Sequence, residues 1–126
     1  MAWPVTTAAA CLGVSVRTLR YYEELGLIRP DRTPGNARVY DSRSMARAEW
    51  IIDLRRAGLA PAEIILLDAL DAHEARDRLQ ARLASRMADL EAKCALVRRI
   101  LSGQDSLPVA NQTRSREAHN GAGGGA

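Results

Sequence analysis

The chain has 126 residues, of which 26% are charged and 4% are aromatic, and its formal net charge is +3. This length favours one compact domain with appended segments, because typical domains contain about 100–150 residues. No apolar run approaches the roughly 18 residues that a membrane span needs, and the N-terminus lacks the pattern of a secretion signal. Two distant cysteines, Cys11 and Cys94, do not make a disulfide framework. We therefore expect a cytoplasmic protein in a reducing compartment.

The basic residues are seventeen arginines and a single lysine, Lys93, and their excess over acidic residues is local. Residues 1–47 contain seven arginines, four acidic residues and all three tyrosines. Arginine pairs with phosphate, and tyrosine adds a flat ring and a hydroxyl donor, so this segment suits a polyanion. A net charge of +3 alone also fits an ordinary solvated surface. The arrangement of the residues has to decide between the two.

The N-terminal residues have the pattern of two short helices joined by a turn. Thr6 or Thr7 can cap a first helix, which Gly13 ends. Ser15 is a good N-cap for a second helix, Val16 to Leu25, and a glycine follows where a left-handed residue is expected. Two short helices with a glycine in the turn predict a helix-turn-helix.

A small hairpin is predicted directly after these helices. Leu27 to Pro30 is expected to be extended, and the run TPGN at residues 33–36 is a strong turn signal. Arg38 to Tyr40 then alternates like a returning strand. A hairpin in this position predicts a winged helix.

Two further helices are expected to form most of the core. Asp41 or Ser42 caps the first, whose apolar residues recur at helical spacing as far as Gly58. Pro61 stands in the first turn of the next helix, where its missing N–H costs nothing. The run IILL at residues 64–67 makes that helix unusually apolar, so we expect it to be largely covered.

From about Glu74 to Leu101 the chain has no Gly or Pro and predicts one long helix. Apolar residues recur along it in a heptad-like stripe with one stutter. A helix of about 28 residues is roughly 42 Å long. On a lone helix, such an apolar stripe would be exposed to water. We therefore favour a self-paired coiled coil over a helix folded back on its own domain. The predicted dimer-interface residues are Leu79, Leu83, Met87, Leu90, Cys94, Val97 and Leu101.

These features divide the chain into a winged helix-turn-helix domain at 1–70, a dimerisation helix at 71–102 and a polar tail at 103–126. The tail is expected to be disordered from its composition. There is no Gly-rich phosphate loop, no nucleophile with a plausible base and no spaced carboxylate pair. His73 and His119 are isolated. We therefore expect no enzyme activity, no cofactor and no metal site.

The two cysteines are interpreted as packing residues, Cys11 in the first helix and Cys94 in the apolar stripe. A redox pair across the dimer stays open for Cys94.

The run from Gly13 to Ile28, GVSVRTLRYYEELGLI, resembles the DNA-reading segment of MerR-family transcription regulators. Arg38 to Asp41 looks like the family's wing, and Leu54 to Ile64 looks like the helix pair that supports it. The resemblance covers about residues 5–70, which makes it far more specific than a short motif. It implies a mainly α fold, with a winged helix-turn-helix followed by a long antiparallel coiled-coil dimerisation helix.

The resemblance also implies a function. Such regulators bind promoter DNA as homodimers, with one recognition helix per half-site, where the −35 and −10 elements are too far apart. They bend and untwist the DNA so that RNA polymerase can engage both elements. Two recognition helices that bind half-sites one DNA turn apart, ~34 Å, need a connecting element of about that length. The predicted long helix has a length of this order. The expected partners are double-stranded promoter DNA, a second copy of the chain and, through the promoter, RNA polymerase.

Site residues follow from the resemblance position by position. Arg17 is the best candidate for a base contact, because arginine can bond guanine bidentately. Tyr21 and Tyr22 match a pair in which one contacts phosphate and the other packs, and the sequence leaves open which does which. Arg38 is expected to reach phosphate, and Tyr40 to pack with an occasional phosphate contact. The predicted DNA-binding residues are Ser15, Arg17, Thr18, Arg20, Tyr21, Tyr22, Arg38 and Tyr40.

The chain departs from the family pattern in the wing and beyond the long helix. Many members carry Gly-Tyr before the wing arginine, where this chain has Asn36 and Ala37, so an aromatic phosphate contact is lost. Metal-sensing relatives place cysteines beyond the dimerisation helix, and none follows Ser102. Drug-sensing relatives append a large domain, for which residues 103–126 are too few. The sequence therefore assigns no input signal.

Two other binding roles stay open from the sequence. An excisionase-like architectural protein would bend DNA without acting on polymerase, although such proteins usually lack a dimerisation helix. A coiled-coil adaptor would use its winged helix to bind protein. The salt dependence of DNA binding separates a DNA-binding role from the adaptor, because phosphate contacts release counterions.

Overall fold

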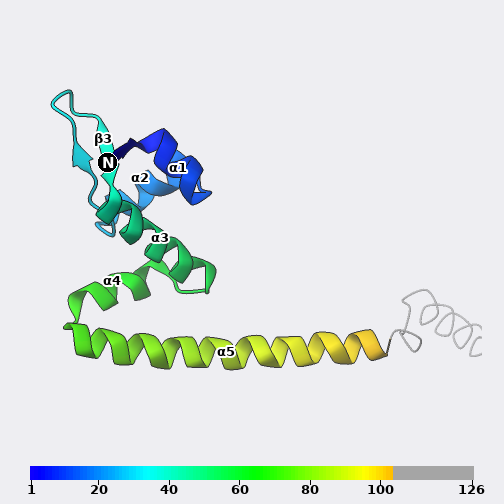
Figure 1. The fold of residues 1–126 in the computed structure, drawn as a ribbon. Coiled ribbons are helices and arrows are strands. Elements are labelled where there is room, and N and C mark those ends of the chain that lie inside the picture. The colour runs from blue at the N-terminus through cyan, green and yellow to red at the C-terminus, as the bar shows by residue number, and fades with distance from the viewer. Residues whose placement is uncertain (104–126) are drawn as a thin grey trace, which may run out of the picture. The chain divides into compact units, whose positions relative to one another are not determined.

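The computed structural model describes residues 1–103, and the tail predicted at 103–126 lies outside the described residues from position 104 onward. The chain divides into two compact units, one formed by residues 1–86 and one that begins at Met87. Within the described residues no helix is both long and apolar enough to cross a membrane. In chain order the elements are β1 (Ala2–Pro4), α1 (Val5–Leu12), α2 (Val16–Glu24), β2 (Asp31–Arg32), β3 (Arg38–Asp41), α3 (Ser42–Arg56), α4 (Pro61–Ala69) and α5 (Ala72–Ser102) (Figure 1). The predicted mainly α fold, with a helix-turn-helix, a small wing sheet and a long C-terminal helix, is confirmed.

Helix α1 begins earlier than the sequence predicts. The expected cap at Thr6 or Thr7 is wrong, because the helix starts at Val5 and Pro4 occupies the N-cap position without a side-chain bond. Proline fits at a helix start because an N–H at that point has no partner within the helix. Gly13 ends α1 with a φ of 69°, a left-handed conformation that glycine adopts without a Cβ clash.

Helix α2 forms as predicted and is anchored by its own cap. The Ser15 hydroxyl accepts a hydrogen bond from the backbone N–H of Thr18 at 3.0 Å, which satisfies one of the free donors of the first turn. Leu19 and Tyr22 lie on the buried side of the helix. The cap therefore fixes where the helix starts, and the two buried side chains fix which face it turns outward.

The wing is a three-stranded antiparallel sheet in the order β1-β3-β2. The segment predicted to be extended at Leu27–Pro30 is not part of the sheet, and the paired strand β2 comes just after it. The sequence did not indicate β1, in which Trp3 pairs with Tyr40 of the central strand. Three residues ending in proline carry no alternation signal, so only the pairing with β3 defines this strand.

The predicted turn at residues 33–36 is confirmed. The backbone N–H of Thr33 donates to the carbonyl of Ala37 at 2.8 Å, and the Thr33 hydroxyl accepts from the N–H of Ala37 at 3.1 Å. Asn36 has a φ of 65°, a left-handed conformation that asparagine tolerates better than most residues.

Helices α3 and α4 begin where the sequence places them. Asp41 is the N-cap of α3 and accepts from the N–H of Ser44 at 2.7 Å. Pro61 opens α4. The expectation that α4 is largely covered is wrong for the single chain, because Ile64 is buried but Leu66 is half-exposed. The largest fully buried side chains are Tyr40, Leu19, Ile28, Ile51, Leu59 and Ile64.

Helix α5 differs along its length in how much of its apolar stripe is covered. Leu79 and Leu83 are partly buried against the core of the first unit. Every residue from Met87 to Ser102 is exposed. Cys94 and Cys11 are both exposed free thiols, so the predicted packing role of Cys11 is wrong.

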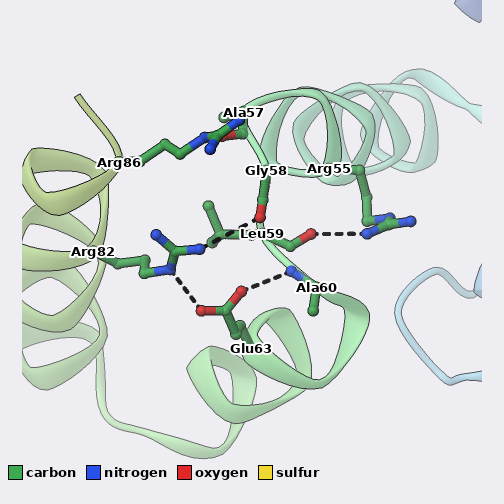
Figure 2. Close-up of polar contacts among 8 residues, drawn as sticks. All are labelled: Arg55, Ala57, Gly58, Leu59, Ala60, Glu63, Arg82 and Arg86. Atoms are coloured by element: carbon green, nitrogen blue, oxygen red, sulfur yellow. Dashed lines mark hydrogen bonds and ion pairs between the residues drawn. The ribbon is translucent and has the colours of Figure 1, made fainter. Parts of the chain in front are cut away.

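Two arginines of α5 bind the turn between α3 and α4 (Figure 2). Arg82 donates from Nε to Oε1 of Glu63 at 2.6 Å and from Nη2 to the carbonyl of Gly58 at 3.4 Å. Arg86 donates from Nε to the carbonyl of Ala57 at 2.9 Å. We name these contacts, made by Arg82, Arg86, Glu63 and the carbonyls of Ala57 and Gly58, the arginine clasp.

The clasp forms just past the end of α3, on the carbonyls of its C-cap residue Ala57 and of Gly58. The last carbonyls of a helix have no partner inside it and carry the negative end of the helix dipole, so cations are favoured there. Gly58 has a φ of 105°, and a Cβ at this position would lie 2.7 Å from Nε of Arg86. The positive φ favours glycine here, and a Cβ would displace the Arg86 guanidinium from its position at this turn. Glu63 contributes a second contact, since its Oε2 accepts from the N–H of Ala60 at 2.7 Å.

Replacing Ser15 with alanine should lower the free energy of unfolding by about 0.5–2 kcal/mol, because the first turn of α2 loses its acceptor. Ser15→Asn retains a side-chain oxygen at the N-cap and should stay close to the unmutated chain. Urea unfolding followed by circular dichroism measures the difference. Equal losses in the two variants would contradict a capping role.

The contribution of Glu63 to stability should depend on pH. The hydrogen bond from Arg82, and then that from the Ala60 N–H, hold the pKa of Glu63 below its ordinary value of 4.5. A carboxyl with a lowered pKa stabilises the fold above its unfolded pKa, and that contribution is lost as the pH falls through the folded value. The difference in urea midpoint between the chain and Glu63→Gln should therefore shrink below a pH of about 4.5. A difference that is constant from neutral to acidic pH would contradict the charged contact.

Candidate nucleic-acid interface

The start of α2 presents polar and basic side chains at the surface. Ser15, Arg17 and Arg20 are exposed, and Thr18 is half-buried. The Ser15 hydroxyl lies 2.9 Å from the hydroxyl of Thr18 as well as capping the helix. Among residues 1–103, neither Arg17 nor Arg20 has a hydrogen-bond or ion-pair partner. Both guanidinium groups are therefore available to a ligand outside the chain.

The structure distinguishes the two adjacent tyrosines. Tyr21 is 46% exposed, whereas Tyr22 is 7% exposed and belongs to the core. Their ring centroids lie 5.9 Å apart with an interplanar angle of 47°. Consecutive residues of a helix point in different directions, so one ring can support the other without sharing its surroundings. Of the pair, Tyr21 is the ring that an external phosphate can reach.

Tyr40 lies entirely in the core. Its hydroxyl has no hydrogen-bond partner among the described residues. Burial raises the pKa of Tyr40, the nearby charge of Glu23 raises it further, and Arg38 opposes the shift. This placement favours the packing role that the sequence assigned first to Tyr40.

One carboxylate of α2 binds arginines from both strands of the hairpin. Glu23 accepts from Nε of Arg38 through Oε2, and from Nη2 of Arg32 through Oε1 at 3.1 Å. Arg32 also donates from Nη1 to the carbonyl of Asn36 at 3.2 Å. The wing is thus tied to α2 by an acidic residue between two basic ones. We name Glu23, Arg32 and Arg38 the wing cluster.

The wing cluster keeps a positive charge after pairing, because two guanidinium groups share one carboxylate. A guanidinium has five N–H donors, so Arg38 retains donors beyond its bond to Glu23. Ordering these side chains before a ligand binds reduces the entropy that binding has to overcome. The cluster can therefore present oriented donors to a phosphate.

Sequence reasoning missed Glu23 and Arg32 as parts of this site. The available signal was an acidic residue inside the basic segment, one position after the tyrosine pair. Its two partners lie 9 and 15 residues away along the chain. Only the folding of the hairpin against α2 brings them together.

The predicted dimer residues lie at very different depths. Leu79 and Leu83 are partly covered by their own domain, as described above. The exposed fractions are 62% for Met87, 43% for Leu90 and 54% for Val97.

Within residues 1–103, no three His, Cys, Asp or Glu side chains are grouped closely enough to hold a metal ion.

Comparison with known proteins finds a family model and relatives that this chain resembles. Residues 5–40 match the family model described as MerR family regulatory protein. The chain is 32% identical over 123 residues to the nodulation protein NolA of Bradyrhizobium elkanii, covering 90% of this chain and 56% of that protein. It spans about half the length of the curated relatives that it matches first.

Solved structures show the same fold. The N-terminal part of MtaN, the multidrug transporter activator of Bacillus subtilis, matches with a TM-score of 0.62 and 26% identity, over 82% of this chain and 94% of that one. HiNmlR, a MerR family regulator lacking the sensor domain and bound to promoter DNA, matches with a TM-score of 0.67 and 21% identity, over 83% of this chain and 91% of that one. In its helix-turn-helix, wing and long helix, and in the segment matched at residues 5–40, the chain is similar to MerR family regulators.

Proposed function

We propose that this chain is a transcription regulator that binds promoter DNA as a homodimer and changes the shape of that DNA. The observation that carries the proposal is the set of outward-facing groups on α2 and the wing. Arg17, Arg20 and Tyr21 are exposed on the recognition helix, and the wing cluster adds the donors of Arg32 and Arg38. All five belong to the same compact unit, residues 1–86.

The groups divide into two kinds of contact. Arg17 lies in the first turn of α2, the part of a recognition helix that reaches base edges in the major groove. Tyr21 and Arg38 suit phosphate contacts, which position a protein on DNA without reading its sequence. Tyr22 and Tyr40 support these groups from the core rather than contacting DNA. HiNmlR, which has the same fold, is bound to promoter DNA in its solved structure, and this supports DNA as the ligand.

The exposed half of α5 supports the homodimer. Met87, Leu90, Val97 and Leu101 follow the heptad-like spacing and are each at least 43% exposed. A continuous apolar stripe on a charged helix is the usual seam of a coiled coil. We infer that a second copy of the chain covers it in antiparallel orientation, so that two recognition helices reach successive half-sites.

DNA bending follows from the dimer as the means of regulation. Two recognition helices on one rod engage half-sites at the rod's spacing, and a promoter with a different spacing has to deform to fit. Such deformation costs several kcal/mol, which phosphate contacts offset. Genome-wide footprinting should place the sites between promoter elements with long spacers. Sites that overlap promoters of ordinary spacing would favour repression by occlusion instead.

Affinity for DNA should fall by roughly 10³-fold or more between 50 and 200 mM salt, if six or more phosphates are neutralised. Fluorescence anisotropy with an operator selected from randomised duplexes measures it. Arg38→Ala should lower the slope of affinity against salt by about one phosphate contact. Arg76→Ala removes an exposed arginine from α5 and serves as the charge-matched control with an unchanged slope. Affinity that is insensitive to salt would overturn DNA binding in favour of a protein-binding adaptor.

Leu90→Asp should convert the dimer to a monomer, because a charge in the seam of a coiled coil has no partner there. Sedimentation equilibrium measures the change, and tight binding to a palindromic operator should be lost with it. Ala95→Asp is the matched control, since position 95 is turned about 140° around the helix from Leu90. A monomeric unmutated chain would overturn the dimer.

A further inference from the structure

The arginine clasp fixes the start of α5 by directional contacts. Arg82 and Arg86 are four residues apart and therefore lie on one face of the helix. Two of their acceptors, the carbonyls of Ala57 and Gly58, are backbone atoms of the α3–α4 turn, which cannot rotate as side chains do. Figure 2 shows both guanidinium groups directed to this turn. Two anchored points about 6 Å apart along an axis define the direction of that axis.

The apolar contacts of α5 cannot supply this directionality. Leu79 and Leu83 pack against the core, but hydrophobic contact is proportional to buried area and has little angular preference. Hydrogen bonds weaken steeply as their angle departs from linear. The hydrogen bonds of Arg82 and Arg86 therefore resist rotation or sliding of α5.

A small change of direction at the clasp has a large effect at the other end of the helix. The 16 residues from Met87 to Ser102 span about 24 Å of helix at 1.5 Å per residue. Tilting a rod of that length by roughly 10° moves its end by about 4 Å, more than the 3.4 Å between successive base pairs.

We propose that Arg82 and Arg86, with Glu63, are specificity-determining positioning residues that set the half-site spacing accepted by the dimer. The proposal rests on the proposed function, and it concerns spacing rather than the base sequence of a half-site. Glu63 orients the Arg82 guanidinium through the 2.6 Å contact, and Arg86 locks the second point on Ala57. With the clasp intact the dimer accepts one spacing; without it the dimer tolerates several.

The test compares operators that differ only in spacing. The selected palindromic operator is lengthened or shortened at its centre by one and two base pairs, and the full-length chain is titrated with each duplex by fluorescence anisotropy. The unmutated chain should prefer its best spacing over the neighbouring ones by about tenfold, since each added pair moves and rotates the far half-site. The double variant Glu63→Gln, Arg86→Gln should reduce that ratio to about threefold or less, or move the preferred spacing.

Further variants separate positioning from folding. Glu63→Gln alone keeps one oxygen for the Ala60 N–H and loses both the charge and the oxygen that accepts from Arg82, so it should fold and show part of the effect. Arg86→Lys keeps a cationic donor for the Ala57 carbonyl and should restore the spacing preference. Arg78→Gln removes an exposed arginine of the same helix outside the clasp and should leave the profile unchanged.

Each outcome decides the proposal. A flattened or shifted spacing profile, with unchanged preference for the half-site bases, supports it. A uniform loss of affinity at every spacing shows a merely structural role and overturns it, as does an unchanged profile in folded Glu63→Gln. If the unmutated chain binds no selected duplex, the proposed function itself fails. If it binds but the variants keep its profile, only the spacing role is overturned.

Discussion

The junction of α3, α4 and the first half of α5 depends on the contacts of Arg82 and Arg86 with the carbonyls of Gly58 and Ala57. The C-terminal end of α3 carries the negative end of the helix dipole, and the donors come from a helix that begins 14 residues after Gly58. By supplying them, Arg82 and Arg86 join α5 to the domain that contains α2 and the wing. Glu63, in the first turn of α4, accepts from Arg82 and from the Ala60 N–H and so links the same contacts to α4. These polar contacts thus hold the first half of α5 to the turn between α3 and α4.

A single carboxylate has the corresponding role on the opposite side of the domain. Glu23 lies at the end of the recognition helix and pairs with Arg32 and Arg38 from both strands of the hairpin. Beneath it, the ring of Tyr40 fills the core, so the wing is fixed by charge above and by packing below. Both junctions use arginine because its planar, multiply donating group can bond one acceptor and still present donors elsewhere.

The sequence predicted what is local and missed what is distant along the chain. Helix starts at Ser15 and Asp41 and the hairpin turn were predictable because cap and turn residues act within a few positions. Strand β1 and the wing cluster were not, since their partners come from segments that meet only after folding. Adjacent Tyr21 and Tyr22 were ambiguous for the same reason: burial, not residue type, distinguishes them. The burial of α4 was overestimated because an apolar run indicates which side chains need to be buried. It does not indicate whether the same chain or another chain covers them.

The nearly complete use of arginine in place of lysine has a regulatory consequence. Guanidinium groups stay protonated at every physiological pH and are not substrates for lysine acetylation. Lysine acetylation removes a positive charge and so weakens the binding of a protein to nucleic acid. The one lysine side chain, Lys93, lies in the exposed half of α5. Neutralising side-chain amines would therefore leave the charge of α2 and the wing untouched. Acetyltransferases would have no lysine to modify on the surface proposed to face DNA.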